Sequence, residues 1–209
     1  MYIAKHFNHE EAQQILNLTK SFPFVTLISK DSAGDLSISH VPVVTEFVNG
    51  ELVSIKGHFA CRNPHVGHLT SNPQVTIVFG GPHAYITPNW YKSGRDVPTW
   101  NYCVVHVHGR LQLSSAFEEI CTNLKELTLA FESGAGAWQF ELPSDLVRPE
   151  DLTTSIVAFT VVPEKTEAKF KLSQNRPMAD RLGVVEGLEL RKDEMSLLLR
   201  KYMQDTIKL

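Results

Sequence analysis

The segment LSISHVPVVTEFVNGELVSIKGH, residues 36–58, holds two runs rich in β-branched and aromatic residues, separated by Asn49-Gly50. Alternating apolar and polar residues over such short runs are typical of β-strands. A two-residue type I′ turn requires positive φ at both central positions, and Asn-Gly is a pair that tolerates this well. The segment therefore predicts an antiparallel hairpin.

The strand pattern continues on both sides of this hairpin. Residues 24–29 form a similar run upstream, and residues 31–35, DSAGD, supply the turn that joins it to the hairpin. Three more strand-like runs lie downstream, at residues 74–79, 84–87 and 102–113. Together these runs predict a six-stranded antiparallel meander. Further strands at residues 156–162 and 168–172 are expected to close it into a barrel.

Helical patterns occupy the ends of the chain and the connections between strands. The predicted helices run from an Asn8 cap to before Pro23, from Pro64 to about Leu69, over residues 115–131, from Pro149, and over the tail 176–209. Because strands and helices do not alternate, the pattern indicates a mainly β (α+β) fold, an antiparallel barrel with peripheral helices. We expect one barrel domain over residues 1–175 and a helical extension, residues 176–209, packed on it.

Composition excludes several classes of protein. The 209 residues are 43% hydrophobic and 21% charged with a net charge of -3, which is globular and argues against disorder. No basic excess or basic tail is present, so charge disfavours direct DNA binding. Cys61, Cys103 and Cys121 show no C-x-x-C spacing, and no signal peptide or bilayer-length apolar run is present. We therefore expect a cytoplasmic protein that is not attached to a membrane.

Common catalytic and metal-binding motifs are absent from the sequence. It contains no Walker A, H-E-x-x-H or G-x-S-x-G motif, and residues 134–137, GAGA, follow a helix rather than a strand. Two histidine pairs, His65 with His68 and His106 with His108, make a zinc site conceivable. The simpler interpretation is that His65 and His68 lie on the surface of a helix, and that His106 and His108 point outward from a strand. No metal ligand is assigned.

Polar and aromatic residues concentrate in residues 57–65, 80–91 and 97–102. Arg62, at the start of a short helix, can pair with a phosphate while the helix N-terminus offers amide donors to the same anion. Trp90, Tyr91 and Trp100 can stack on a flat ring system. Alternatively, these three aromatic residues pack a loop against the barrel or form a dimer interface. The combination suits a planar, phosphorylated ligand.

These motifs resemble those of the PaiB-like family, described as FMN-binding negative transcriptional regulators. The shared segments, in chain order, are Met1-Tyr2, Lys5-His6-Phe7, His40-Val41-Pro42, Gly57-His58, Arg62-Asn63-Pro64-His65, residues 80–91 (GGPHAYITPNWY), residues 97–102 (VPTWNY) and residues 171–176 (KLSQNR). The sequence departs from the family where Ala4 replaces a usual proline, Val66 a usual aromatic residue and Thr87 a frequent serine.

The resemblance implies a split β-barrel, shared with pyridoxamine phosphate oxidases and flavin reductases, that forms a homodimer with FMN at the subunit interface. The residues expected to meet the phosphate and ribityl chain are His40, Pro42, His58, Arg62 and Asn63, with Arg62 the leading phosphate partner. Those expected near the ring or the partner subunit are His83, Tyr85, Trp90, Tyr91, Thr99, Trp100 and Asn101. Late in the chain, positive charge and amide hydrogen bonds are expected from Lys171, Ser173, Gln174, Asn175 and Arg176.

Three functions remain open on the sequence. The first is an FMN-binding homodimer that acts as a negative transcriptional regulator. The second is an FMN-dependent oxidoreductase acting on a small molecule, with His83 or Tyr85 as a proton donor. Its reductant would dock directly over the flavin, because the sequence has no nicotinamide-binding fingerprint. The third is a split barrel that binds haem or a metal instead.

Overall fold

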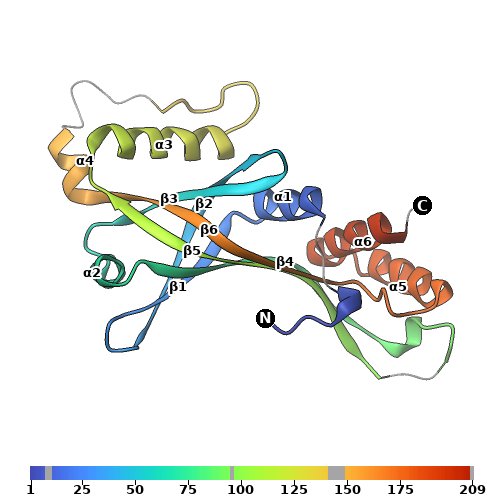
Figure 1. The fold of residues 1–209 in the computed structure, drawn as a ribbon. Helices are drawn as coiled ribbons and strands as arrows, with labels where there is room; N and C mark the ends of the chain where they lie inside the picture. The colour runs from blue at the N-terminus through green and yellow to red at the C-terminus, as the bar shows by residue number, and fades with distance from the viewer. Residues whose placement is uncertain (8–10, 95–96, 141–148, 208–209) are drawn as a thin grey trace. The chain divides into compact units, whose positions relative to one another are not determined.

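The computed structural model describes residues 1–209 except 8–10, 95–96, 141–148 and 208–209 (Figure 1). Its strands are β1 (Phe24–Lys30), β2 (Leu36–Val48), β3 (Glu51–Ala60), β4 (Gln74–Ile86), β5 (Thr99–Ser114) and β6 (Ile156–Lys171). Its helices are α1 (Ala12–Ser21), α2 (Pro64–Ser71), α3 (Phe117–Phe131), α4 (Pro149–Ser155), α5 (Met178–Arg191) and α6 (Glu194–Ile207). Two short 3₁₀ helices are η1 (Lys5–Phe7) and η2 (Pro88–Trp90).

The six strands form a closed barrel in the order β1-β2-β3-β6-β5-β4. This confirms the predicted mainly β class and the barrel. The predicted meander is wrong, because β3 pairs with β6 and β1 pairs with β4. The strands predicted at residues 74–79 and 84–87 form one continuous strand, β4, over residues 74–86. Those predicted at residues 156–162 and 168–172 likewise form one strand, β6, over residues 156–171. In β4 the alternation of burial slips at Gly81 and Pro82, which are both buried, so a glycine and proline cluster typical of a turn lies inside a strand.

The β2–β3 hairpin forms as predicted. Asn49 and Gly50 have φ of 52° and 84°, the positive values that a type I′ turn requires. Val43 pairs with Gly57 in the antiparallel register. A Cβ added to Gly57 would lie 2.6 Å from Cζ of Phe159 and 2.9 Å from the carbonyl oxygen of Pro42, so only glycine fits at this inward position.

Two compact units make up the chain. Unit 1 comprises Met1–Glu11, Gly80–Val105 and Glu167–Leu209, and unit 2 comprises Ala12–Phe79 and His106–Thr166. Strands β4, β5 and β6 contribute residues to both. The predicted domain boundary at residue 175 stays a prediction.

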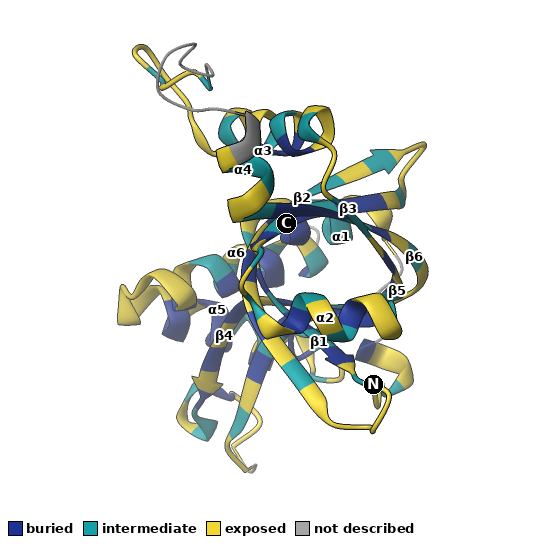
Figure 2. Cartoon of the chain, turned by 90° about the vertical axis from the view of Figure 1, so that its left-hand side faces the viewer, coloured by how far each residue is buried: buried dark blue, intermediate teal, exposed yellow. Residues whose placement is uncertain are grey.

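The core of unit 2 consists of residues on the inner side of the strands, and buried and exposed positions alternate along them (Figure 2). The rings of Phe59 and Phe159 lie 4.8 Å apart there. On β5, Val105 and Val107 are fully buried whereas His106 and His108 are partly exposed, as predicted. Helix α3 buries Ile120, Asn123 and Leu127, whereas Leu129 is 60% exposed.

The tail of unit 1 is helical as predicted, in two helices rather than one. The break lies at Lys192, whose φ is 61°, and Oδ1 of Asp193 accepts a hydrogen bond of 2.9 Å from the backbone N–H of Ser196. Leu188, Leu199 and Met203 are fully buried. Within the described residues, no helix has the length and apolar character needed to cross a bilayer. The predicted Asn8 cap of the first helix lies outside the described residues.

Candidate functional site

In unit 2, His40 and Pro42 lie on the outer side of β2, where both are exposed. His40 Nδ1 is 3.2 Å from the hydroxyl of Thr26, and its ring stacks on Phe24 at a centroid distance of 6.3 Å. Phe24 is 68% exposed and pairs directly with Pro42 across the ladder. This outer face of β1 and β2 thus combines an imidazole with exposed apolar side chains.

His58, on β3, is directed toward α3. Its Nδ1 lies 3.0 Å from Oδ1 of Asn123, which is 5% exposed. Because an amide oxygen only accepts, His58 donates here and its Nδ1 carries a proton. His58 is therefore tied to α3 in this structure.

Arg62 and Asn63 lie at the start of α2, but only one of them is engaged. Asn63 is the N-cap: its Oδ1 accepts from the backbone N–H of His65 at 3.0 Å, and its Nδ2 donates to Ser39 at 3.3 Å. This confirms the predicted start of a helix at Pro64. Arg62 is exposed and makes no hydrogen bond or ion pair with any described residue. Its guanidinium is available to an anion beside the N-terminus of α2.

The expected surface position of His65 is wrong. His65 is 3% exposed, with Nε2 2.8 Å from the hydroxyl of Ser29 and Nδ1 2.8 Å from the hydroxyl of Ser39. Burial, and then the neighbouring His68, lower the pKa of His65. The signal in the sequence is that Ser29 and Ser39 occupy inward strand positions, where a hydroxyl requires a buried partner.

In unit 1, three predicted residues form an aromatic patch on the outer side of β4 and β5, namely His83, Tyr85 and Trp100. The Trp100 ring lies 6.2 Å from that of His83 and 6.1 Å from that of Tyr85, the latter edge-on. Trp100 is 53% exposed and Tyr85 is 39% exposed. Gly80, which is also on β4, faces open space, because no atom lies within 4 Å of the position that a Cβ would take there. The patch offers open aromatic surface of the kind on which a flat ring system can stack.

Lys171 brings a cation to the strand that carries Trp100. Its ammonium group donates to the Trp100 carbonyl oxygen at 2.7 Å and to the Thr99 hydroxyl. Burial, and then the neighbouring Lys169, lower the pKa of Lys171. Both acceptors are neutral oxygens. An anion that reached Lys171 would therefore supply the negative charge that these two partners do not.

Of the predicted residues Asn101, Ser173, Gln174 and Asn175, the first three make hydrogen bonds within unit 1. Asn101 is fully buried and donates to the Ser173 hydroxyl at 2.9 Å, whereas its Oδ1 has no hydrogen-bond partner among the described residues. Ser173 adopts a φ of 61°, and Gln174 accepts from the Leu172 backbone N–H at 2.7 Å. Asn175 is exposed. These contacts hold the turn after β6.

Trp90 and Tyr91 lie against residues of unit 1 that follow β6. The guanidinium of Arg191 lies 4.7 Å from the Trp90 ring centroid, and that of Arg176 lies 4.9 Å from the Tyr91 ring centroid. Tyr91 is only 6% exposed, and no residue in the described part of the chain forms a hydrogen bond with its buried hydroxyl. The geometry matches the alternative in which these two rings pack a loop.

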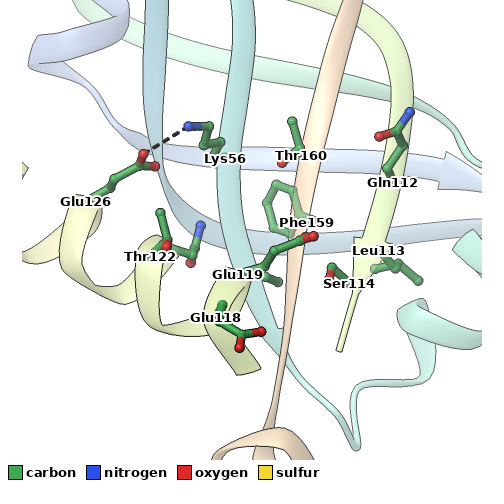
Figure 3. Close-up of a pocket in the computed structure, with 12 residues that line it drawn as sticks. Lys56, Gln112, Leu113, Ser114, Glu118, Glu119, Thr122, Glu126, Phe159 and Thr160 are labelled. Carbon is green, nitrogen blue, oxygen red and sulfur yellow. Dashed lines mark hydrogen bonds and ion pairs between the residues drawn. The ribbon is translucent and has the colours of Figure 1, made fainter. Parts of the chain in front are cut away.

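A pocket of about 490 Å³ lies in unit 2 between α3 and the strands β3, β5 and β6 (Figure 3). Figure 3 shows Glu118, Glu119 and Glu126 of α3 beside it. Its lysine, Lys56, is already paired with Glu126 at 3.0 Å. Since carboxylates outnumber cations here, the pocket repels a phosphate. None of the predicted site residues lines it.

The chemistry of the remaining predicted residues fits FMN. In unit 2, an uncommitted arginine beside a helix N-terminus suits the phosphate. In unit 1, the exposed aromatic patch suits the ring system, and the partly buried Lys171 suits a negative or carbonyl edge. His40, Pro42, His58, Arg62 and Asn63 belong to unit 2, and the other predicted residues belong to unit 1.

Comparison with known proteins identifies the family. Residues 1–165 match the family described as "Putative FMN-binding domain". The chain is 31% identical over 211 residues to the protease synthase and sporulation protein PAI 2 of Bacillus subtilis, covering 100% of this chain and 99% of that protein. An uncharacterised protein of Aspergillus fumigatus is 28% identical, with 81% of this chain and 82% of that protein covered.

Solved structures share the fold at low sequence identity. The flavocytochrome Anf3 of Azotobacter vinelandii matches with a TM-score of 0.62 and 10% identity, over 81% of this chain and 72% of that one. The FAD and heme binding protein of Mycobacterium smegmatis matches with a TM-score of 0.59 and 12% identity, over 81% and 76%. With a family match over most of its length, this chain belongs to the FMN-binding domain family of split-barrel fold, with FMN as its cofactor.

Proposed function

We propose that the protein is a homodimer that holds FMN at the interface between its subunits. The observation that carries the dimer is the outer face of β1 and β2. Across this ladder Phe24 pairs with Pro42, Ile28 with Ile38, and Lys30 with Leu36. Phe24, Leu36 and Ile38 are each more than half exposed, so their side chains form an apolar surface that a second copy would cover.

We assign the FMN phosphate to Arg62 and the N-terminus of α2. Arg62 supplies a charge-assisted, bidentate partner, and the N-terminus of α2, whose first turn Asn63 caps, adds the positive end of the helix dipole. Trp100, with Tyr85 and His83 beside it, would contact the ring system, and Lys171 would hold its polar edge. When bound, FMN supplies one- and two-electron redox chemistry.

A regulatory role is supported by the likeness to PAI 2, whose name refers to protease synthesis and sporulation. We propose that such a role does not rest on a basic tail that binds DNA. Arg181 donates to Thr206 at 2.8 Å, Arg200 pairs with Glu189 at 3.1 Å, and Arg191 covers the Trp90 ring. These cations are engaged by other residues of the tail and of unit 1, and the chain carries a net charge of -3.

The second candidate function is an FMN-dependent oxidoreductase. It is favoured by the proton-bearing groups in the aromatic patch, where the rings of His83 and Tyr85 flank the exposed Trp100. Both lie where a small molecule docked over the flavin would meet a proton donor. A cytoplasmic setting accords with either function, because Cys61, Cys103 and Cys121 are all free thiols.

A paired titration with FMN and riboflavin, followed by flavin fluorescence, tests the proposal. We expect FMN to bind more tightly than riboflavin by roughly tenfold or more, because only FMN offers a phosphate to Arg62. Equal affinity for the two flavins would contradict the phosphate assignment. Binding of neither would contradict the proposed function as a whole.

A further inference from the structure

Helix α5, residues Met178–Arg191, packs against the segment 88–93 of the same unit, most closely at Trp90. A Cβ added to Gly183 would lie 2.1 Å from the carbonyl oxygen of Trp90, and one added to Gly187 would lie 2.2 Å from the Trp90 ring. Residues four apart share one face of a helix. Glycine inside a helix costs about 1 kcal/mol relative to alanine, so two glycines on this face are explained by the close approach of Trp90.

Polar and cationic contacts extend this packing along the helix. Asp180 is 1% exposed, and its carboxylate accepts from the backbone N–H of Ser93 at 2.8 Å and from the Ser93 hydroxyl at 2.7 Å. Toward the end of α5, the Arg191 guanidinium lies over the Trp90 ring. Helix α5 thus holds the segment at two residues. Trp90 packs against Gly183, Gly187 and Arg191, and Ser93 is hydrogen-bonded to Asp180.

The held segment connects the two strands that carry the aromatic patch. Tyr85 lies near the end of β4, three residues before Pro88, and Trp100 is the second residue of β5. Fixing residues 88–93 restricts the geometry with which β4 leads into β5. None of Asp180, Gly183 and Gly187 belongs to the patch itself. The family match ends at residue 165, so α5 lies outside the matched residues.

We propose that α5 is a positioning element for the cofactor: Asp180, Gly183 and Gly187 hold residues 88–93 in place and so set the arrangement of Tyr85 and Trp100 that receives FMN. The proposal rests on the proposed function. It gives the C-terminal helical tail a role in cofactor affinity through Trp90 and Ser93, without direct contact between α5 and FMN.

The test compares three variants of the full chain, Gly187→Ala, Asp180→Ala and the control Gly67→Ala. Gly67 is also a helical glycine, in α2, but no atom lies within 4 Å of its Cβ position. Amide hydrogen exchange at Trp90, Tyr91 and Ser93 is measured without FMN, and FMN affinity is then measured by fluorescence titration. In Gly187→Ala and Asp180→Ala we expect exchange at these amides to rise, and FMN affinity to fall, each by roughly tenfold.

Gly67→Ala is expected to leave both quantities at their wild-type values. Asp180→Ala adds no atoms against Trp90, so it keeps the test valid if Gly187→Ala does not fold. Asp180→Asn, which retains a carbonyl acceptor for Ser93, should recover part of the lost affinity.

Unchanged exchange at residues 90–93 in both variants would overturn the proposal, as would raised exchange with wild-type FMN affinity. Failure of the wild-type protein to bind FMN would instead contradict the proposed function. In that case the exchange comparison, made without FMN, still decides whether α5 holds the segment.

Discussion

Nε2 of His65, in α2, lies 2.8 Å from the hydroxyl of Ser29, in β1. The other ring nitrogen is equally close to Ser39, and all three residues are buried. A neutral imidazole has one donor and one acceptor nitrogen, and each hydroxyl can take the complementary role. A charged imidazole would have two donors and no means of solvation, which is why burial lowers the pKa of His65.

Stability should depend on pH through His65. The folded-state pKa lies below the ordinary value of 6.5, so the unfolded state binds more protons as the pH falls through 6.5. The free energy of unfolding should therefore decrease as the pH drops below 6.5, and it should level off below the folded-state pKa. Thermal unfolding at pH values from 8 to 5 measures this, with His65→Gln as comparison. A His65→Gln protein with the same pH dependence as wild type would assign the effect to other groups.

Removing the Arg62 guanidinium beside α2 should weaken FMN binding. Arg62→Ala is expected to cost about 1.5–3 kcal/mol of binding free energy, because a charge-assisted phosphate contact is lost. The melting temperature should stay near the wild-type value, since Arg62 is exposed and makes no hydrogen bond or ion pair with any described residue. Arg110→Ala, at another exposed arginine on β5, is the matched control. The same affinity in Arg62→Ala and Arg110→Ala would remove Arg62 from the site.

The aromatic patch offers a paired test of ring stacking. Trp100 and Trp138 are similarly exposed, at 53% and 57%, but only Trp100 belongs to the patch. Trp100→Ala should weaken FMN binding by about 1–3 kcal/mol, the usual effect of losing an aromatic stacking partner for a base. Trp138→Ala should leave the affinity unchanged in the same fluorescence titration. Equal effects of the two substitutions would show that the patch does not receive the flavin.

Dimer formation should depend on the outer face of β1 and β2. Ile38→Glu places a charge in the proposed contact and is expected to shift the protein to a monomer, as measured by light scattering during gel filtration. Leu129→Glu is the control, because Leu129 is 60% exposed and Ile38 is 58% exposed, but Leu129 lies on α3. A dimer that persists in Ile38→Glu would exclude this face.

Local chemistry made much of the fold predictable from the sequence. Asn49-Gly50 fixes a turn because few other pairs accept positive φ twice, and Asn63-Pro64 begins a helix because the cap and the ring both suit its first turn. The resemblance supplied the cofactor and the fold family. These elements depend on residues adjacent in the chain, which a single sequence reports directly.

Contacts between distant segments were not predictable. Gly80 to Pro82 suggest a turn, yet they continue β4, because pairing with neighbouring strands outweighs local preference. The burial of His65, in α2, depends on Ser29 of β1 and Ser39 of β2, which lie far from it in the sequence. The contact of Gly183 and Gly187 with Trp90 joins residues nearly a hundred positions apart, and nothing in the spacing of those glycines identifies the partner.

Gel filtration of the purified protein after addition of excess FMN, with light scattering and visible absorbance recorded together, tests the homodimeric FMN site most directly. We expect flavin absorbance to elute with a species of about twice the chain mass of 23.5 kDa, at one FMN per chain. A colourless protein peak, or flavin bound to a species of the single-chain mass, would contradict it.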